Sequence, residues 1–363
     1  MRNLWRVRIL MLGWALALGP GLTAATLSEA EVRDWAVAQG GDAVFDDAGQ
    51  LVDLYLGFTW TTDADLDRIE QLANVRRLDL SLSYVSDEGV ERLTSLRGLT
   101  DLNLFGAEFI TDVAVSHLRA LENLERLNLR GTDITDTSME YIASLSKLRA
   151  LDVSFTQVST VGLERLAELT QLEELALGGN KISGAGLPVL SVLPNLRKLT
   201  LGGTQRRNSG YWAVSLTDVD LELVGSLTQL EWLDLSGSLR SPLNAISDLG
   251  VSKLAGLREL QVLDLSQTRV SSVGLEPLAK LPKLERLSLW RAERIDDDAA
   301  PLLALMKALE VLDLSETKVT DRTLRELTSL ENLRRLYLSG TAVTPEAVEQ
   351  FRRERPLCEV SAQ

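Results

Sequence analysis

The sequence predicts an α/β solenoid, in which short strands form one parallel sheet and short helices cover the opposite side. Two observations predict it. A triplet with leucine at its first and third positions recurs about every 24 residues, and each copy is followed by a turn residue and then by apolar residues at helical spacing. A fixed period of this size indicates stacked units, none of which can bury its apolar face alone. We therefore expect one elongated domain over most of the 363 residues.

Each triplet is predicted to be a short strand. Its first and third residues point to one face and its middle residue to the other, because side chains alternate along a strand. The triplets begin at Leu54, Leu78, Leu102, Leu127, Leu151, Leu175, Leu199, Leu233, Leu263, Leu287, Leu312 and Leu336.

The rest of each unit is predicted to be a turn and a helix. A Thr or Ser follows five positions after the first leucine, as at Thr59 and Thr132, where its hydroxyl can satisfy backbone groups of the turn. Pairs such as Ser86-Asp87 and Thr320-Asp321 are typical helix N-caps, with the acid favoured by the helix dipole. Leucines at a spacing of three then indicate a short helix.

These repeats resemble the bacterial leucine-rich repeat proteins of the 24-residue type, and the resemblance covers residues 51–360. It implies a horseshoe with a parallel concave β-sheet, short convex helices and a role in binding. Residues 26–50 are predicted to form a capping helix and an edge strand near Ala43–Phe45. Residues 345–363 are predicted to form the C-terminal cap, since terminal repeats are atypical.

Residues 1–25 are predicted to be a secretory signal peptide. Three arginines precede an apolar core, and small residues end at a cleavage site near Ala25. An uncleaved anchor is the alternative. No later apolar run reaches transmembrane length. Cys358 is the single cysteine, so no intramolecular disulfide can form, which favours a bacterial periplasmic or secreted protein.

Composition argues against several classes of function. A net charge of −14 lacks the basic footprint of a nucleic-acid-binding protein. With one histidine, His117, and one cysteine, there is no nucleophile–base pair or zinc site. The run Asp296–Asp298 fits a helix N-cap better than a calcium site. We expect neither an enzyme nor a cofactor.

Two neighbouring units are longer than the rest. The first leucines are 34 residues apart from Leu199 to Leu233 and 30 apart from Leu233 to Leu263. The extra residues form rim insertions near 205–215 and 239–245, which we expect to touch. The first insertion carries side chains that are common in binding hot spots, namely Arg206, Arg207, Tyr211 and Trp212. The alternative is that Tyr211 and Trp212 only pack on the rim.

The predicted concave face changes along its length. The residues before the first four triplets alternate in charge (Asp53, Arg77, Asp101, Arg126), which indicates a solvated ion ladder, and from Trp232 onward this column becomes more apolar. The predicted binding surface therefore joins the two insertions with Trp232, Val262, Arg286 and Trp290.

We therefore predict a non-catalytic, monomeric scaffold that binds a protein through its concave face and two rim loops. Glycan or cell-wall binding is one alternative, because Trp and Tyr in a shallow groove also suit sugar rings. A structural role in the envelope and delivery to a host as an effector are the others.

Overall fold

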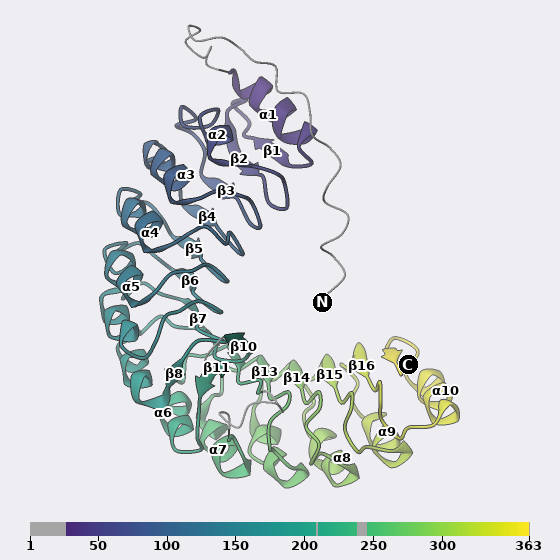
Figure 1. Ribbon diagram of the computed structural model, residues 1–363. Coiled ribbons are helices and arrows are strands. Elements are labelled where there is room, and N and C mark those ends of the chain that lie inside the picture. The colour runs from purple at the N-terminus through teal and green to yellow at the C-terminus, as the bar shows by residue number, and fades with distance from the viewer. Residues whose placement is uncertain (1–26, 208–209, 238–244, 363) are drawn as a thin grey trace, which may run out of the picture.

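The computed structural model describes residues 27–207, 210–237 and 245–362. The predicted signal peptide and nearly all of the second insertion lie outside these residues. The chain forms an open arc with strands along its inner side and helices along its outer side (Figure 1). None of the helices in the described chain has the length and apolarity needed to cross a bilayer.

One sheet of fourteen strands lines the concave side. Only β1 (Asp42–Phe45) is antiparallel to its neighbour, β2 (Leu51–Tyr55), and all other pairs are parallel. The remaining strands have three residues each: β3 (Arg77–Asp79), β4 (Asp101–Asn103), β5 (Arg126–Asn128), β6 (Ala150–Asp152), β7 (Glu174–Ala176), β9 (Lys198–Thr200), β12 (Trp232–Asp234), β13 (Val262–Asp264), β14 (Arg286–Ser288), β15 (Val311–Asp313), β16 (Arg335–Tyr337) and β17 (Glu359–Ser361).

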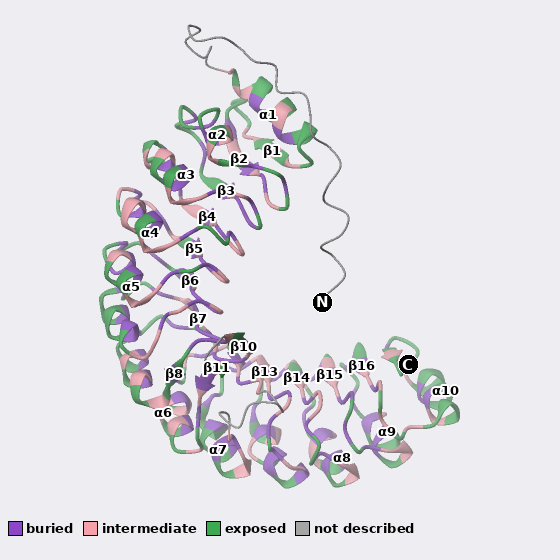
Figure 2. Cartoon of the chain, in the orientation of Figure 1, coloured by how far each residue is buried: buried purple, intermediate pink, exposed green. Residues whose placement is uncertain are grey.

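The leucines of the triplets stack in register and form the core. Leu54 pairs with Leu78, and Leu78 pairs with Leu102, so each coil places its leucine beside the next. These leucines are at most 2% exposed, and buried residues run along the middle of the arc (Figure 2). The predicted strand alternation is confirmed.

Helices and 3₁₀ turns cover the convex side. The α-helices are α1 (Glu29–Ala38), α2 (Asp63–Leu66), α3 (Asp87–Arg92), α4 (Asp112–Leu118), α5 (Asp136–Ile142), α6 (Asp220–Ser226), α7 (Asp248–Ser252), α8 (Ala300–Leu303), α9 (Asp321–Leu327) and α10 (Pro345–Glu354). The 3₁₀ segments are η1 (Leu93–Ser95), η2 (Gly162–Glu168), η3 (Gly184–Val192), η4 (Lys253–Gly256), η5 (Ser272–Leu275), η6 (Leu278–Lys280) and η7 (Asp297–Ala299).

The aspartate after each N-cap does more than the sequence analysis expected. The N-caps themselves are confirmed, since the Ser86 hydroxyl accepts from the Glu88 N–H. The carboxylate of Asp87, however, reaches the next coil, where it accepts from the backbone N–H (2.8 Å) and the hydroxyl (2.6 Å) of Thr111. The sequence analysis assigned this aspartate only to the helix dipole and missed its bonds to the next coil. We call this row the aspartate ladder; its aspartates are Asp63, Asp87, Asp112, Asp136, Asp218, Asp248, Asp297 and Asp321.

The turn after each strand is equally regular. The Thr59 hydroxyl donates to the Leu56 carbonyl at 2.6 Å, and Thr132 does the same to Leu129, as predicted. The residue just before this Thr or Ser adopts a positive φ in nearly every coil. Glycine has this conformation at little cost, but six non-glycine residues also adopt it: Phe58, Leu82, Phe155, Gln267, Arg291 and Glu316.

A helix packs beside each end of the sheet. At the N-terminus, α1 begins with a capping box between Ser28 and Glu31 and packs against β1. At the C-terminus, α10 precedes β17, which pairs with β16 as the last parallel strand. Cys358 is buried there.

The first insertion is not an irregular loop, which corrects the prediction. It is a β-hairpin of β10 (Thr204–Arg207) and β11 (Gly210–Ser215). β11 also pairs in parallel with β8 (Ile182–Ser183) of the preceding coil. This pairing buries Ala213 and Val214 against the core, which explains why a segment predicted as a loop is a strand.

Candidate functional site

A groove lies on the concave face between β2 and β12. It has a volume of about 590 Å³ and is lined by side chains from eight consecutive strands of the sheet. Of the predicted site residues, only Trp232 lines it. The groove therefore occupies the N-terminal part of the sheet, which the sequence analysis assigned to a solvated ion ladder.

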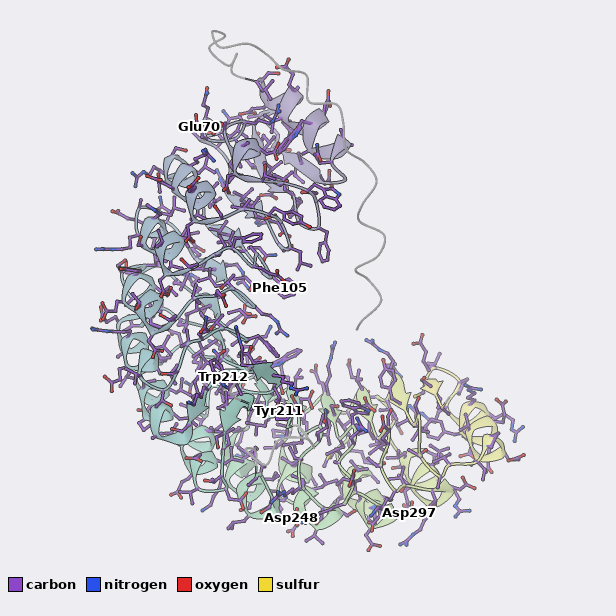
Figure 3. All side chains as sticks on the ribbon, viewed as in Figure 1. Glu70, Phe105, Tyr211, Trp212, Asp248 and Asp297 are labelled. Atoms are coloured by element: carbon purple, nitrogen blue, oxygen red, sulfur yellow. The ribbon has the colours of Figure 1, made fainter. Side chains whose placement is uncertain are left out.

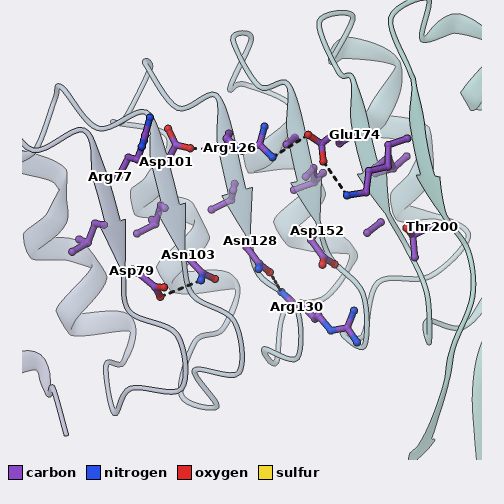
Figure 4. Close-up of a pocket in the computed structure, with 18 of the residues that line it drawn as sticks. Arg77, Asp79, Asp101, Asn103, Arg126, Asn128, Arg130, Asp152, Glu174 and Thr200 are labelled. Atoms are coloured by element: carbon purple, nitrogen blue, oxygen red, sulfur yellow. Dashed lines mark hydrogen bonds and ion pairs between the residues drawn. The ribbon is translucent and has the colours of Figure 1, made fainter. Parts of the chain in front are cut away.

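The ion ladder exists and forms one edge of this groove (Figure 4). Arg77 lies 3.5 Å from Asp53, and Arg126 lies 3.6 Å from Asp101. Arg126 also reaches over the small Ala150 side chain to Glu174 (3.0 Å), although β6 separates their strands.

Glu174 is the centre of the ladder. It accepts from Arg126 and lies 3.4 Å from the Lys198 ammonium. Partial burial acts to raise the pKa of Glu174, but the hydrogen bonds and charges of Arg126 and Lys198 outweigh it and hold the pKa below its usual value. The ammonium of Lys198 in turn lies 5.0 Å from the ring centre of Trp232.

A second column holds aspartates that bond within their own coil. Asp79 and Asp152 each accept from a backbone N–H two residues ahead at 2.8 Å. Asp234, Asp264 and Asp313 repeat this bond. Burial raises the pKa of Asp264, and the charges of Asp234 and Asp313 add to the effect. These carboxylates thus have a structural task in the turn.

The hairpin contacts coils that precede it in the chain. Arg207 lies 3.3 Å from Asp133 and 5.6 Å from the ring centre of Trp212. Gln205 donates to the Thr156 carbonyl at 2.9 Å. These contacts hold the hairpin against the turns that follow β5 and β6. Tyr211 is 42% exposed on it, and Figure 3 shows it beside Trp212.

The other predicted site residues extend beyond the groove. Val262 and Arg286 follow Trp232 in register on the next two strands. Trp290 lies further along, where its Nε1 donates to Glu316 at 3.1 Å and the Arg291 guanidinium lies 5.3 Å from its ring centre. The structure therefore brings Trp232, Val262 and Arg286 together, but Trp290 belongs to a separate cluster with Arg291 and Glu316. Arg206 is exposed on the hairpin.

The sequence analysis missed an aromatic strip on the rim of the first three coils. Phe58 is 78% exposed, Trp60 61% and Phe109 55%, and the Trp60 ring stacks on Tyr84 with centroids 5.5 Å apart. Aligning the residues after each strand by repeat position, rather than the strands alone, would have found them.

Asp296–Asp298, His117 and Cys358 do not line the groove. Across the part of the chain that the structure describes, there is no group of three or more side chains placed to hold a metal ion. Asp296 caps η7 and accepts from the Asp298 N–H, as predicted for this run. His117 lies on α4. Cys358 is buried, and burial raises the pKa of its thiol.

Comparisons with known proteins agree with this geometry. The family model described as Leucine Rich repeat matches residues 120–143 and 144–167. An internalin from Listeria monocytogenes has a similar structure, with 20% identity, coverage of 91% of this chain and 92% of its own, and a TM-score of 0.57. The chain has the leucine-rich repeat fold.

Two further structures share the solenoid. A chain in the Rad7 and Elc1 complex in yeast is 17% identical over 83% of this chain and 79% of its own, with a TM-score of 0.60. The plant peptide hormone receptor RGFR1, in complex with RGF2, is 14% identical over 86% of this chain and 50% of its own, with a TM-score of 0.50. At these identities the likeness concerns the fold alone. No curated protein matches the sequence.

Proposed function

We propose that this chain is a non-catalytic scaffold that binds a protein in the concave groove between β2 and β12. The groove carries the proposal. It presents paired charges of both signs along one edge and ends at Trp232, whose ring centre lies 5.0 Å from the Lys198 ammonium. Aromatic and arginine anchors with charges around them are common in protein interfaces. Val262, Arg286 and Arg206 extend the proposed surface.

Two arguments support a protein ligand. The groove crosses eight strands at about 4.8 Å each, which suits an extended partner better than a compact small molecule. Two proteins of this fold, RGFR1 and the yeast chain, were also solved in complexes with another protein or peptide. Export through a cleaved signal peptide and a monomeric state remain part of the proposal.

The test compares capture of partners from envelope and medium extracts by the full chain and by designed variants. Lys198→Ala with Trp232→Ala removes the end of the groove. Arg206→Ala with Tyr211→Ala removes two exposed side chains of the hairpin and keeps its buried Ala213 and Val214. Leu305→Ala is the matched control, because Leu305 is 61% exposed on the convex side. We expect one protein to be captured by the wild type and the control and lost with the groove variant.

Other results would redirect the proposal. Equal capture of that protein by the wild type and the groove variant would contradict a site in the groove. Capture of peptidoglycan or polysaccharide alone would favour the glycan-binding alternative.

A further inference from the structure

The aromatic strip on the rim of the first three coils is built as a continuous surface. We define the aromatic rim as Phe58, Trp60, Leu82, Tyr84 and Phe109. Parallel backbone bridges join Thr62 to Tyr84 and Ser86 to Phe109, so the three loops lie side by side. The rings of Trp60 and Tyr84 are within 2° of parallel.

Two residues of the aromatic rim, Phe58 and Leu82, combine a strained backbone conformation with an exposed apolar side chain. Phe58 and Leu82 have φ values of 62° and 53°, a conformation that costs a non-glycine residue about 1–2 kcal/mol. Their side chains are also 78% and 40% exposed to solvent. Gly131 and Gly340 occupy the same repeat position in other coils without either penalty. Strained and exposed apolar residues of this kind point to a function.

Stacking of the coils does not require these rings. The position of Trp60 and Tyr84 is taken by Asp133, Gln157 and Lys181 in the following coils. The bridge from Ser159 to Lys181 has the same form as the bridge from Thr62 to Tyr84. The repeat therefore forms equally well with polar residues, and the aromatic side chains are a property of this end of the rim.

The surrounding groups define which partner fits. The loops 56–62, 80–86 and 104–111 contain no cationic side chain, no amide side chain and a single acid, Glu108. The hydroxyls of Thr59 and Thr61 are buried and bonded to each other at 2.6 Å. A phosphate or an anionic lipid surface would find no counter-ion here, and a sugar would find few of the polar partners that orient it.

We propose that the aromatic rim is a docking site for an uncharged, apolar segment of a protein partner. Three coils at about 4.8 Å each span on the order of 10 Å, which accommodates two or three large apolar side chains. Rings stacked in this way also favour edge-to-face contact with a partner's aromatic side chain. The site is separate from the groove and does not depend on the function proposed for it.

The experiment uses a displayed library of random 12-residue peptides as the probe and the full chain as the target. The affinity of each enriched peptide is then measured by fluorescence anisotropy on the wild type and on Trp60→Gln with Phe109→Gln. Glutamine is chosen because Gln157 holds the same rim position in a later coil. Trp290→Gln is the matched control for the loss of one tryptophan, and thermal melting of each variant verifies folding.

We expect enriched peptides to be rich in aromatic and aliphatic residues. The double variant should weaken their binding by at least about tenfold, the size typical of an interface hot spot, and Trp290→Gln should leave binding unchanged. A library whose peptides all bind the double variant as well as the wild type overturns the proposal. So does a library that yields no binding peptide.

Three further outcomes also overturn it, since each assigns another occupant. The first is self-association of the wild type in sedimentation velocity, the second is binding to soluble glycans, and the third is binding to phosphatidylglycerol vesicles. Each counts against the proposal if the wild type shows it and the double variant does not. Glu174→Gln keeps the two proposals apart, because it alters the groove and leaves the aromatic rim intact. Peptides that are weakened only by Glu174→Gln support the groove and contradict the aromatic rim.

Discussion

The rim of the first three coils and the rim of the last coils have one backbone and two chemistries. Phe58 and Glu316 share a repeat position and a left-handed conformation, with φ values of 62° and 56°. At the C-terminal end, Glu316 pairs with Arg291 at 2.8 Å and accepts from Trp290. At the N-terminal end, the corresponding side chains are apolar and exposed. The repeat determines the backbone, whereas the chemistry of the rim side chains differs between the two ends of the molecule.

The substitutions with the largest expected effect on stability should cost about the same at both ends of the molecule. Leu102→Ala lies among the aromatic coils and Leu265→Ala among the later ones, and both leucines are at most 2% exposed. Each substitution should reduce the free energy of unfolding by about 2–5 kcal/mol, because both remove a buried side chain and leave a cavity. Urea unfolding monitored by circular dichroism measures this. A cost confined to one end would show that the coils are not equivalent in packing.

The aspartate ladder should give the next largest effect. Asp112 accepts from the backbone N–H and hydroxyl of Thr135 and from the hydroxyl of Ser138. Asp112→Asn should cost about 1–3 kcal/mol at pH 7, as expected for hydrogen bonds to a charged group.

The effect should also depend on pH. Burial acts to raise the pKa of Asp112, but the bonds from Ser138 and Thr135 outweigh it, so the folded pKa lies below 3.8. A lowered pKa stabilises the fold above the unfolded pKa and loses this contribution as the pH falls through the folded pKa. The difference between wild type and Asp112→Asn should thus shrink below about pH 4. Urea midpoints measured from pH 7 to pH 3 test this, and a constant difference would contradict the ladder's charged form.

The sequence predicts features that lie within one coil better than bonds that connect two coils. Strands, N-caps and turn hydroxyls are local, and a leucine triplet or a Ser-Asp pair carries its own signal. The second task of Asp87 is not local, because its partner Thr111 lies one coil away. Such bonds become visible only when the repeats are aligned in space.

The site was harder to predict for a related reason. Arg126 reaches Glu174 across the small Ala150, and β11 forms a strand between β10 and β8. Neither fact is encoded next to the residue concerned. The prediction therefore gave weight to the insertion and Trp232, but missed the groove beside the ion ladder and the exposed rings at Phe58 and Trp60.

Two phenylalanines at one repeat position sharpen the comparison further. The Phe155 ring packs beneath the Arg130 guanidinium, whose Cζ lies 4.4 Å from the ring centre. The ring also lies against Gly179, where an added Cβ would be only 2.7 Å from Phe155 Cδ1. Phe58 is largely exposed in the same conformation. Phe155→Gly should reduce the free energy of unfolding by about 1–2 kcal/mol, through lost packing that exceeds the relieved strain.

Phe58→Gly is the counterpart of Phe155→Gly and should not reduce the free energy of unfolding. It relieves the left-handed conformation and removes exposed apolar surface, so the protein should become as stable as the wild type or up to about 1 kcal/mol more stable. Thermal melting of the two variants side by side gives the answer. A clear loss of stability in Phe58→Gly would show that the ring is a packing residue and would remove the strain argument for the aromatic rim.

The smallest effect is expected in the ion ladder. Glu174→Gln removes the charge that Arg126 and Lys198 share, but these side chains are partly exposed, so the cost should be at most about 1 kcal/mol and should fall as salt is added. Because the pKa of Glu174 is lowered in the fold, its contribution should also disappear as the pH falls through that value. Urea unfolding at low and high salt measures the cost. If partner binding depends strongly on Glu174 while stability does not, the ion ladder serves partner recognition. A cost of several kcal/mol that salt leaves unchanged would instead make the ladder part of the framework of the N-terminal coils.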